Sequence, residues 1–104
     1  MTINEWSDAT AMAEAVQNKT VSPRELVEAT IRESERTNPK INAIVSQRYE
    51  KALKEAETRD FSEKPFAGVP IFLKDLGQEQ AGEPSTAGSL LFTSYRATET
   101  DNYV

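Results

Sequence analysis

Phe66 to Leu76 reads FAGVPIFLKDL, a nearly continuous apolar run that ends on a single lysine, Lys74. An apolar run of this length, bounded by glycine and proline, is typical of a buried β-strand. The run predicts a strand over residues 69–73. Because Pro70 has no N–H, this strand is expected at a sheet edge or unpaired at that point. Lys74 would then lie where the strand leaves the core and its ammonium is poorly hydrated.

A desolvated lysine loses its proton more easily than an exposed one, so it can act as a base near neutral pH. Lys74 is therefore the residue of this chain best suited to chemistry. Local sequence alone favours a second interpretation, a surface lysine that protects a sheet edge against aggregation. Asp75 points to the opposite strand face. It is interpreted as a turn or cap residue that accepts nearby backbone N–H groups, with support of the strand end at Lys74 as the alternative.

The first 60 residues have the apolar periodicity of amphipathic helices. One helix is expected from the N-cap Ser7 to about Gln17, and a third from about residue 47 to residue 59. The second begins at Ser22, where Pro23 and Glu25 complete a capping box with a helix-starting proline.

Residues 38–39, Asn-Pro, are expected to end the second helix, since a residue before proline avoids helical geometry. Residues 43–45 are expected as a short strand. Residues 86–91 are expected as either a further strand or an irregular segment.

The composition excludes several kinds of site. The chain has no cysteine and no histidine, which excludes disulfides, thiolate metal sites and a histidine-based catalytic triad. A net charge of −5 argues against nucleic-acid binding, and no apolar run approaches the roughly 20 residues of a membrane helix. A cytoplasmic protein without metal, cofactor, nucleic-acid partner or membrane partner is expected.

Ser85, Thr86 and Ser89, which follow the lysine, are the hydroxyl residues considered as nucleophiles. None has a nearby histidine, cysteine or other base candidate that would activate it as a nucleophile. They are interpreted as loop residues that hydrogen-bond to backbone groups.

Residues 68–76, GVPIFLKDL, followed by residues 81–89, AGEPSTAGS, resemble the first signature block of the amidase signature family of serine hydrolases. Residues 22–27 and 38–43 resemble the helical N-terminus of these enzymes, and residues 95–104 resemble the link into their next helix. The resemblance implies an α/β fold in which N-terminal helices precede the first strands of a mixed sheet. Residues 1–104 would be the N-terminal part of an amidase domain, with a helical region over 1–60 and the first signature strands and loop over 66–104.

The resemblance also implies a Ser–Ser–Lys mechanism in which Lys74 is the base and draws a proton through a bridging serine. The nucleophilic serine then attacks the carbonyl of a small-molecule amide. Neither serine motif has a match in this sequence. Asp101 is suited to cap the start of a helix, but the sequence ends three residues later. An N-terminal fragment, truncated and inactive by itself, is therefore expected.

Two alternatives stay open. Within the family, the chain could belong to a protein resembling the glutamyl-tRNA amidotransferase subunit that uses ammonia on a misacylated tRNA. In a different class, it could be a non-catalytic helical module that self-associates. In either case, a sheet cut after its first strands would expose apolar residues such as Val69, Ile71 and Phe72, and a homo-oligomer or local disorder after Gly77 is expected.

Overall fold

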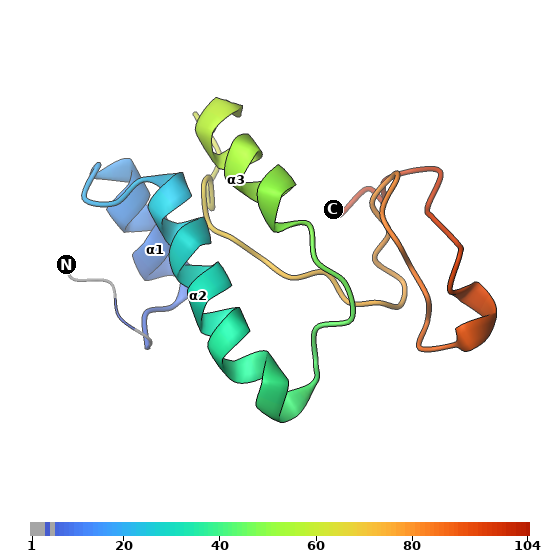
Figure 1. Cartoon of the computed structure of the whole chain (residues 1–104). Coiled ribbons are helices and arrows are strands. Elements are labelled where there is room, and N and C mark those ends of the chain that lie inside the picture. Colours follow the sequence, from blue (N-terminus) through green and yellow to red (C-terminus); the bar gives the residue numbers. More distant parts are fainter. Residues whose placement is uncertain (1–3, 5) are drawn as a thin grey trace. The chain divides into compact units, whose positions relative to one another are not determined.

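The computed structural model describes Asn4 and residues 6–104, in two compact units divided after Pro70 (Figure 1). We call residues up to 70 the helical unit and residues 71–104 the loop unit. The helical unit contains α1 (Ala9–Gln17), α2 (Pro23–Ile41) and α3 (Tyr49–Thr58). The loop unit contains the short 3₁₀ helix η1 (Leu90–Phe92). The helical region predicted over 1–60 includes residues 1–3 and 5, which lie outside the described residues.

The first two helices begin at side-chain caps. Asp8, rather than the predicted Ser7, caps α1, and its carboxylate accepts the Ala11 N–H at 2.8 Å. The capping box predicted for α2 is confirmed, because Glu25 N–H donates to Ser22 Oγ at 3.1 Å and Ser22 N–H donates to Glu25 Oε2 at 2.7 Å. Two otherwise unpaired backbone donors are thus satisfied within one turn of helix.

The end of α2 differs from the prediction, because the helix continues through Pro39 to Ile41. Asn38 accepts two hydrogen bonds that hold the helix end. Its carbonyl accepts the Asn42 N–H at 2.7 Å, and its side-chain oxygen accepts the Ile44 N–H at 2.8 Å. These bonds offset the donor that Pro39 lacks. Asn42 then ends the helix in the left-handed conformation, with φ of 49°.

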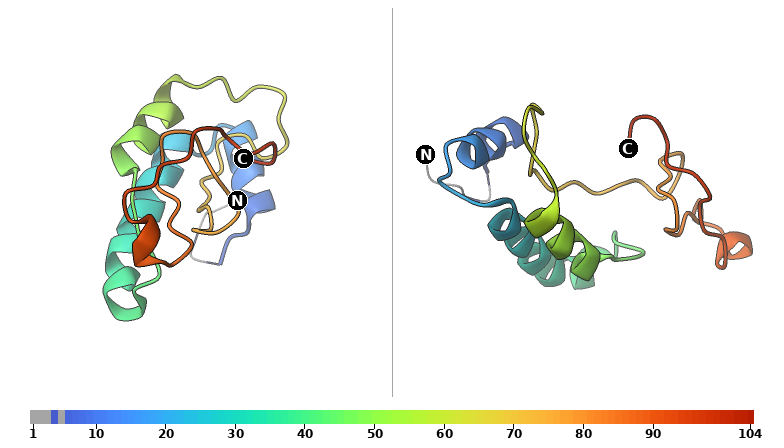
Figure 2. Two further views of the ribbon diagram at one scale, coloured as in Figure 1. Left: turned by 90° about the vertical axis from the view of Figure 1, so that its right-hand side faces the viewer. Right: turned by 90° about the horizontal axis from the view of Figure 1, so that it is seen from above.

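Helix α3 runs beside α2 and packs against it, as Figures 1 and 2 both show. It is shorter than predicted at both ends. An ion pair between Arg24 and Glu57 joins the two helices, and Arg24 also pairs with Glu28 one turn along α2 at 2.8 Å. Both pairs are partly exposed, so each contributes little to stability.

Residues 66–70 return the chain to the first two helices. Gly68 is buried there with φ of +84°, a conformation that side chains rarely adopt. A Cβ at this position would lie 2.8 Å from Cγ of Pro23 and 3.3 Å from Cγ1 of Val16. Only glycine therefore allows this approach to α1 and α2.

The fold class predicted from the sequence, α/β with the first strands of a mixed sheet, is wrong for the described residues. None of residues 43–45, 69–73 and 86–91 forms a strand. A strand needs a neighbouring backbone to pair with. Over residues 69–73, Val69 N–H instead closes a turn on Phe66 O at 3.2 Å. Ile71 and Phe72 are exposed rather than buried.

The loop unit is organised by two antiparallel segments, residues 79–84 and 96–101. An isolated β-bridge joins Pro84 and Arg96. Beside it, Gly82 N–H donates to Ala97 O at 2.8 Å and Ala97 N–H donates to Glu83 O at 3.0 Å. This short pairing holds the ends of the segment that carries η1.

Candidate active site

Lys74, the predicted catalytic lysine, lies at the start of the loop unit with an exposed side chain. Its backbone N–H donates to Oε1 of Gln78 at 2.7 Å, which begins a tight turn. The expected poor hydration depended on a strand beneath the lysine, and no strand forms at that place among the described residues. The role of Lys74 as a base stays a prediction.

Asp75 is the best-connected residue next to the lysine. Its Oδ1 accepts the Thr86 N–H at 2.7 Å, and its Oδ2 accepts the Thr86 hydroxyl. In return its carbonyl accepts the Ala87 N–H at 2.9 Å. We call these three bonds the Asp75–Thr86 clamp. Asp75 accepts a backbone N–H as interpreted, but the prediction of a nearby partner is wrong, because Thr86 lies 11 residues along the chain.

The clamp keeps its carboxylate charged. Hydrogen bonds from the Thr86 hydroxyl, and then from the Thr86 and Gly88 N–H groups, hold the pKa of Asp75 below its ordinary value. At neutral pH these are charge-assisted bonds, which are shorter and stronger than neutral ones.

Of the three hydroxyl residues considered as nucleophiles, two make hydrogen bonds within the loop unit and the third lines a pocket. Thr86 belongs to the clamp, and Ser89 Oγ accepts the Leu91 N–H at 3.2 Å as the cap of η1. Ser85 lines a pocket. The interpretation as loop residues that hydrogen-bond to backbone groups agrees with the contact of Ser89, whereas the Thr86 hydroxyl donates to a side chain, that of Asp75.

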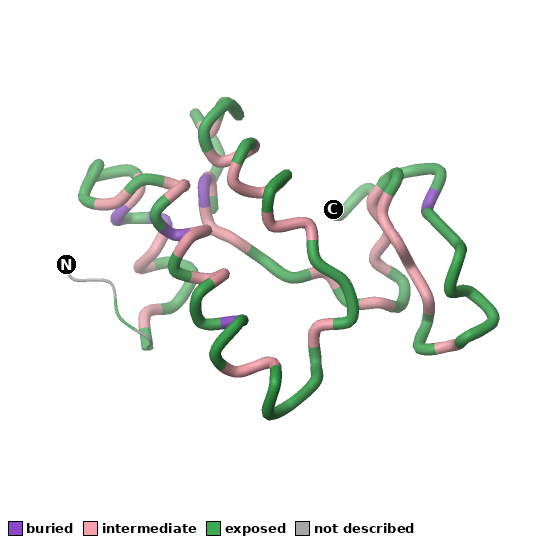
Figure 3. Tube along the Cα trace, in the orientation of Figure 1, coloured by how far each residue is buried: buried purple, intermediate pink, exposed green. Residues whose placement is uncertain are grey.

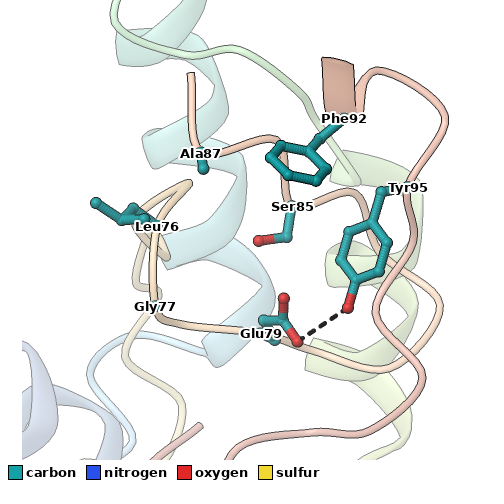
Figure 4. Close-up of a pocket in the computed structure, with 7 residues that line it drawn as sticks. All are labelled: Leu76, Gly77, Glu79, Ser85, Ala87, Phe92 and Tyr95. Carbon is teal, nitrogen blue, oxygen red and sulfur yellow. Dashed lines mark hydrogen bonds between the residues drawn. The ribbon is translucent and has the colours of Figure 1, made fainter. Parts of the chain in front are cut away.

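A pocket of about 240 Å³ lies within the loop unit (Figure 4). Leu76, Phe92 and Tyr95 give it an apolar wall, with the two rings edge to face at a centroid distance of 6.5 Å. Glu79 supplies its charged group and accepts the Tyr95 hydroxyl at 3.3 Å. Lys74 is not among the lining residues, which begin two positions further along the chain.

The other side of Glu79 is tied to the end of the chain. Its N–H donates to Oδ2 of Asp101 at 2.7 Å, and Asp101 N–H donates to Glu79 O at 3.0 Å. Asp101, expected as a helix cap, instead closes a long loop.

Burial first, and then the charge of Glu79, raises the pKa of Tyr95. Burial first, and then the charge of Asp101, raises the pKa of Tyr103. Both phenols therefore stay neutral donors at neutral pH.

The sequence did not reveal the Asp75–Thr86 clamp, the Glu79–Asp101 pair or the pocket. Their members are 11 to 22 residues apart, and no periodicity or motif spacing connects such positions.

Over Asn4 and residues 6–104, no group of three or more His, Cys, Asp or Glu side chains could hold a metal ion. No helix in the same residues is long and apolar enough to cross a membrane.

Known proteins similar to this chain were found by sequence and by structure. Residues 25–104 match the Amidase family. The 6-aminohexanoate-cyclic-dimer hydrolase of Pseudomonas sp. (strain NK87) is 43% identical over 88% of this chain and 18% of its own length. The lipoamidase of Enterococcus faecalis is 41% identical over 81% of this chain and 12% of its own length.

A solved structure, of 6-aminohexanoate cyclic dimer hydrolase complexed with substrate, superposes with a TM-score of 0.82 at 40% identity. The superposition covers 94% of this chain and 20% of the solved one. The chain thus spans at most about a fifth of the length of these relatives.

Proposed function

The chain belongs to the amidase family, and we propose that it supplies Lys74 as the catalytic base of an enzyme that hydrolyses carboxylic amides. The observation that carries this proposal is the family match over residues 25–104, which encloses Lys74 and both ends of the Asp75–Thr86 clamp. Relatives at 41% and 43% identity are named as a lipoamidase and a hydrolase, which supports the reaction class.

In the proposed mechanism, neutral Lys74 accepts a proton from a bridging serine, which accepts one from the nucleophilic serine. The nucleophile's oxygen forms a bond to the amide carbonyl carbon, and the C–N bond breaks as the amine leaves with a proton. Water then attacks the acyl-enzyme and releases the carboxylic acid. Both serines would come from sequence outside residues 1–104.

The test is amide turnover by the natural full-length protein that contains this chain, with wild type compared with Lys74→Ala. Linear aliphatic, cyclic and aryl amides are the substrates. We expect kcat to fall by about a thousandfold, the size of effect that general acid–base catalysis provides. Lys64→Ala is the matched control, because it removes another exposed lysine outside the loop unit and should leave turnover unchanged.

Two results would contradict the proposal. Equal turnover by wild type and Lys74→Ala would remove the catalytic role from the lysine. Hydrolysis of no amide by either protein, together with ammonia transfer to glutamyl-tRNA, would establish the amidotransferase alternative.

Self-association of the 104-residue chain is the second candidate, favoured by exposed apolar side chains in the loop unit. Ile71, Leu90 and Leu91 are 73%, 93% and 85% exposed. Exposed apolar residues of this number are typical of surfaces that other chains cover. Sedimentation of the isolated chain tests this candidate: a monomer at high concentration contradicts it. The isolated chain is expected to hydrolyse no amide.

A further inference from the structure

Two side chains hold the backbone on either side of Lys74. Gln78 accepts the lysine's own N–H at 2.7 Å, and the Asp75–Thr86 clamp fixes the next residue through three hydrogen bonds. The lysine side chain is exposed, so packing contributes little to its position. Its placement therefore depends on the backbone from which it projects.

We propose that Asp75 and Thr86 are a positioning pair that sets the location of the Lys74 amine during amide hydrolysis. This inference rests on the proposed function, since it assigns no chemistry to Asp75 itself. The clamp connects residue 75 to residues 86 and 87, so it removes the freedom of the loop that follows the lysine. A misplacement of about 1 Å costs a catalytic group roughly a hundredfold in rate.

The chemistry of the clamp suits a rigid support. Both carboxylate oxygens of Asp75 are engaged by one residue, through its N–H and its hydroxyl, which fixes the carboxylate in orientation as well as in distance. The low pKa of Asp75 keeps this carboxylate ionised at neutral pH. The Thr86 hydroxyl is a part of the clamp that a substitution can remove while the Asp75 carboxylate and the backbone bonds stay in place.

The first experiment measures kcat and KM separately for Thr86→Val in the natural full-length protein. Valine has the shape of threonine without the hydroxyl. We expect kcat to fall by about 10- to 100-fold with KM within about twofold, because positioning acts on the reacting group and not on substrate binding. Thr86→Ser restores the hydroxyl and should restore kcat to near the wild-type value.

Thr93→Val is the matched control. The Thr93 hydroxyl also donates to an oxygen of the loop unit, Leu90 O at 2.6 Å, but it does not contact Asp75. The Thr93→Val variant should therefore leave kcat unchanged. If Thr86→Val does not fold, Asp75→Asn replaces it, because asparagine keeps one acceptor oxygen and loses the charge. The same fall in kcat with unchanged KM is expected.

The second experiment places Thr86→Val in the Lys74→Ala background and measures residual turnover of an activated aryl amide. If the pair acts through the lysine, Thr86→Val should cause no further loss there. The same loss in both backgrounds, a failure of Thr86→Ser to rescue kcat, or an unchanged kcat in Thr86→Val would each overturn the positioning role. An unchanged kcat in Lys74→Ala alone would instead overturn the proposed function, so the two failures are distinguishable.

Discussion

The two units of the chain satisfy their backbone hydrogen bonds in different ways. In the helical unit the caps act over three residues, from Asp8 to Ala11 and from Ser22 to Glu25. In the loop unit carboxylates reach much further, from Asp75 to a residue 11 positions away and from Asp101 to one 22 positions away. The side-chain bonds to backbone groups that organise the first unit are therefore local, whereas those of the second unit come from a few long-range charged acceptors.

Burial separates the units in the same way. The helical unit buries Ala13 and Ala15 of α1 and Leu26 of α2, whereas Ala97 is the buried apolar residue of the loop unit (Figure 3). Hydrophobic stabilisation scales with the apolar area removed from water. The loop unit therefore relies more heavily on its hydrogen bonds, and the predictions below test this difference.

The largest effect is expected for Gly68→Ala in the helical unit. The new Cβ would meet Cγ of Pro23 at 2.8 Å, and alanine disfavours φ of +84°. Strain and overpacking together should lower the free energy of unfolding by about 3 kcal/mol. Gly82→Ala is the matched control, since Gly82 has φ of +83° and no atom within 4 Å of the place its Cβ would take. The control should cost only about 1 kcal/mol, from strain alone. Equal losses, measured by denaturant unfolding, would contradict the role of the close contact.

A smaller effect is expected for Asp101→Ala in the loop unit. It removes the acceptor of the Glu79 N–H and opens the pairing between the two ends of the unit. Hydrogen exchange at Glu79 should become about tenfold faster, and exchange at Gly82 should also rise. Asp60→Ala is the comparison in the helical unit, because Asp60 accepts the Ser62 N–H only two residues away. In Asp60→Ala, only the exchange at Ser62 should become faster. Faster exchange at distant residues in Asp60→Ala, or unchanged exchange at Gly82 in Asp101→Ala, would contradict the division into local and long-range bonding.

Ser22→Ala removes half of the capping box of α2 and should cost about 1 kcal/mol. The loss is modest because the helix keeps its remaining backbone bonds and its packing against α3. Circular dichroism during thermal unfolding measures it. Ser46→Ala, in the loop before α3, is the control and should leave the midpoint unchanged. A loss as large as that of Gly68→Ala would show that the helical unit depends on one cap.

The smallest effect is expected from mild acid, because hydrogen bonds lower the pKa of both Glu25 and Asp75. The Ser22 N–H is the main cause at Glu25, and the Thr86 hydroxyl is the main cause at Asp75. A lowered pKa in the folded state means that each carboxylate contributes its stability above the ordinary pKa, 4.5 for Glu25 and 3.8 for Asp75. The contribution is lost as pH falls through the lowered value.

Amide chemical shifts measured by NMR during an acid titration test this expectation. The Thr86 and Ser22 amides should both be constant at neutral pH and shift only below these ordinary values. Asp75→Asn should abolish the titration at Thr86 and leave that at Ser22 unchanged. A Thr86 shift centred above the ordinary pKa of aspartate would contradict the sign of the effect.

The sequence predicted the helices of the helical unit well because their signals are local, whereas the strand expected over residues 43–45 does not form. The capping box at Ser22 and Glu25 was identified with its correct partners, and the three helices were placed to within a few residues. The end of α2 was missed because the Asn38 side chain binds Ile44, a bond that the rule for residues before proline does not consider.

The loop unit could not be predicted in the same way. A strand was expected over residues 69–73, and a strand or an irregular segment over residues 86–91, but a strand also needs a partner that local sequence does not specify. Asp75 was recognised as an acceptor, whereas its partner Thr86 was not, because no rule of spacing relates the two positions. The role of Lys74 rests on family resemblance, since its exposure gives no sign of a low-dielectric environment.

The pairing of Gly82 and Glu83 with Ala97 also bears on how this chain can vary in length. It closes the segment that carries η1 at its base, so residues inserted between Ser89 and Tyr95 would lengthen a loop whose ends are already held. Doubling the length of a flexible loop costs only about 0.6 kcal/mol in closure entropy. Insertions at Leu90 or Leu91 would leave the Asp75–Thr86 clamp outside the altered stretch. This stretch is therefore where we expect the chain to tolerate added residues at the lowest cost in stability.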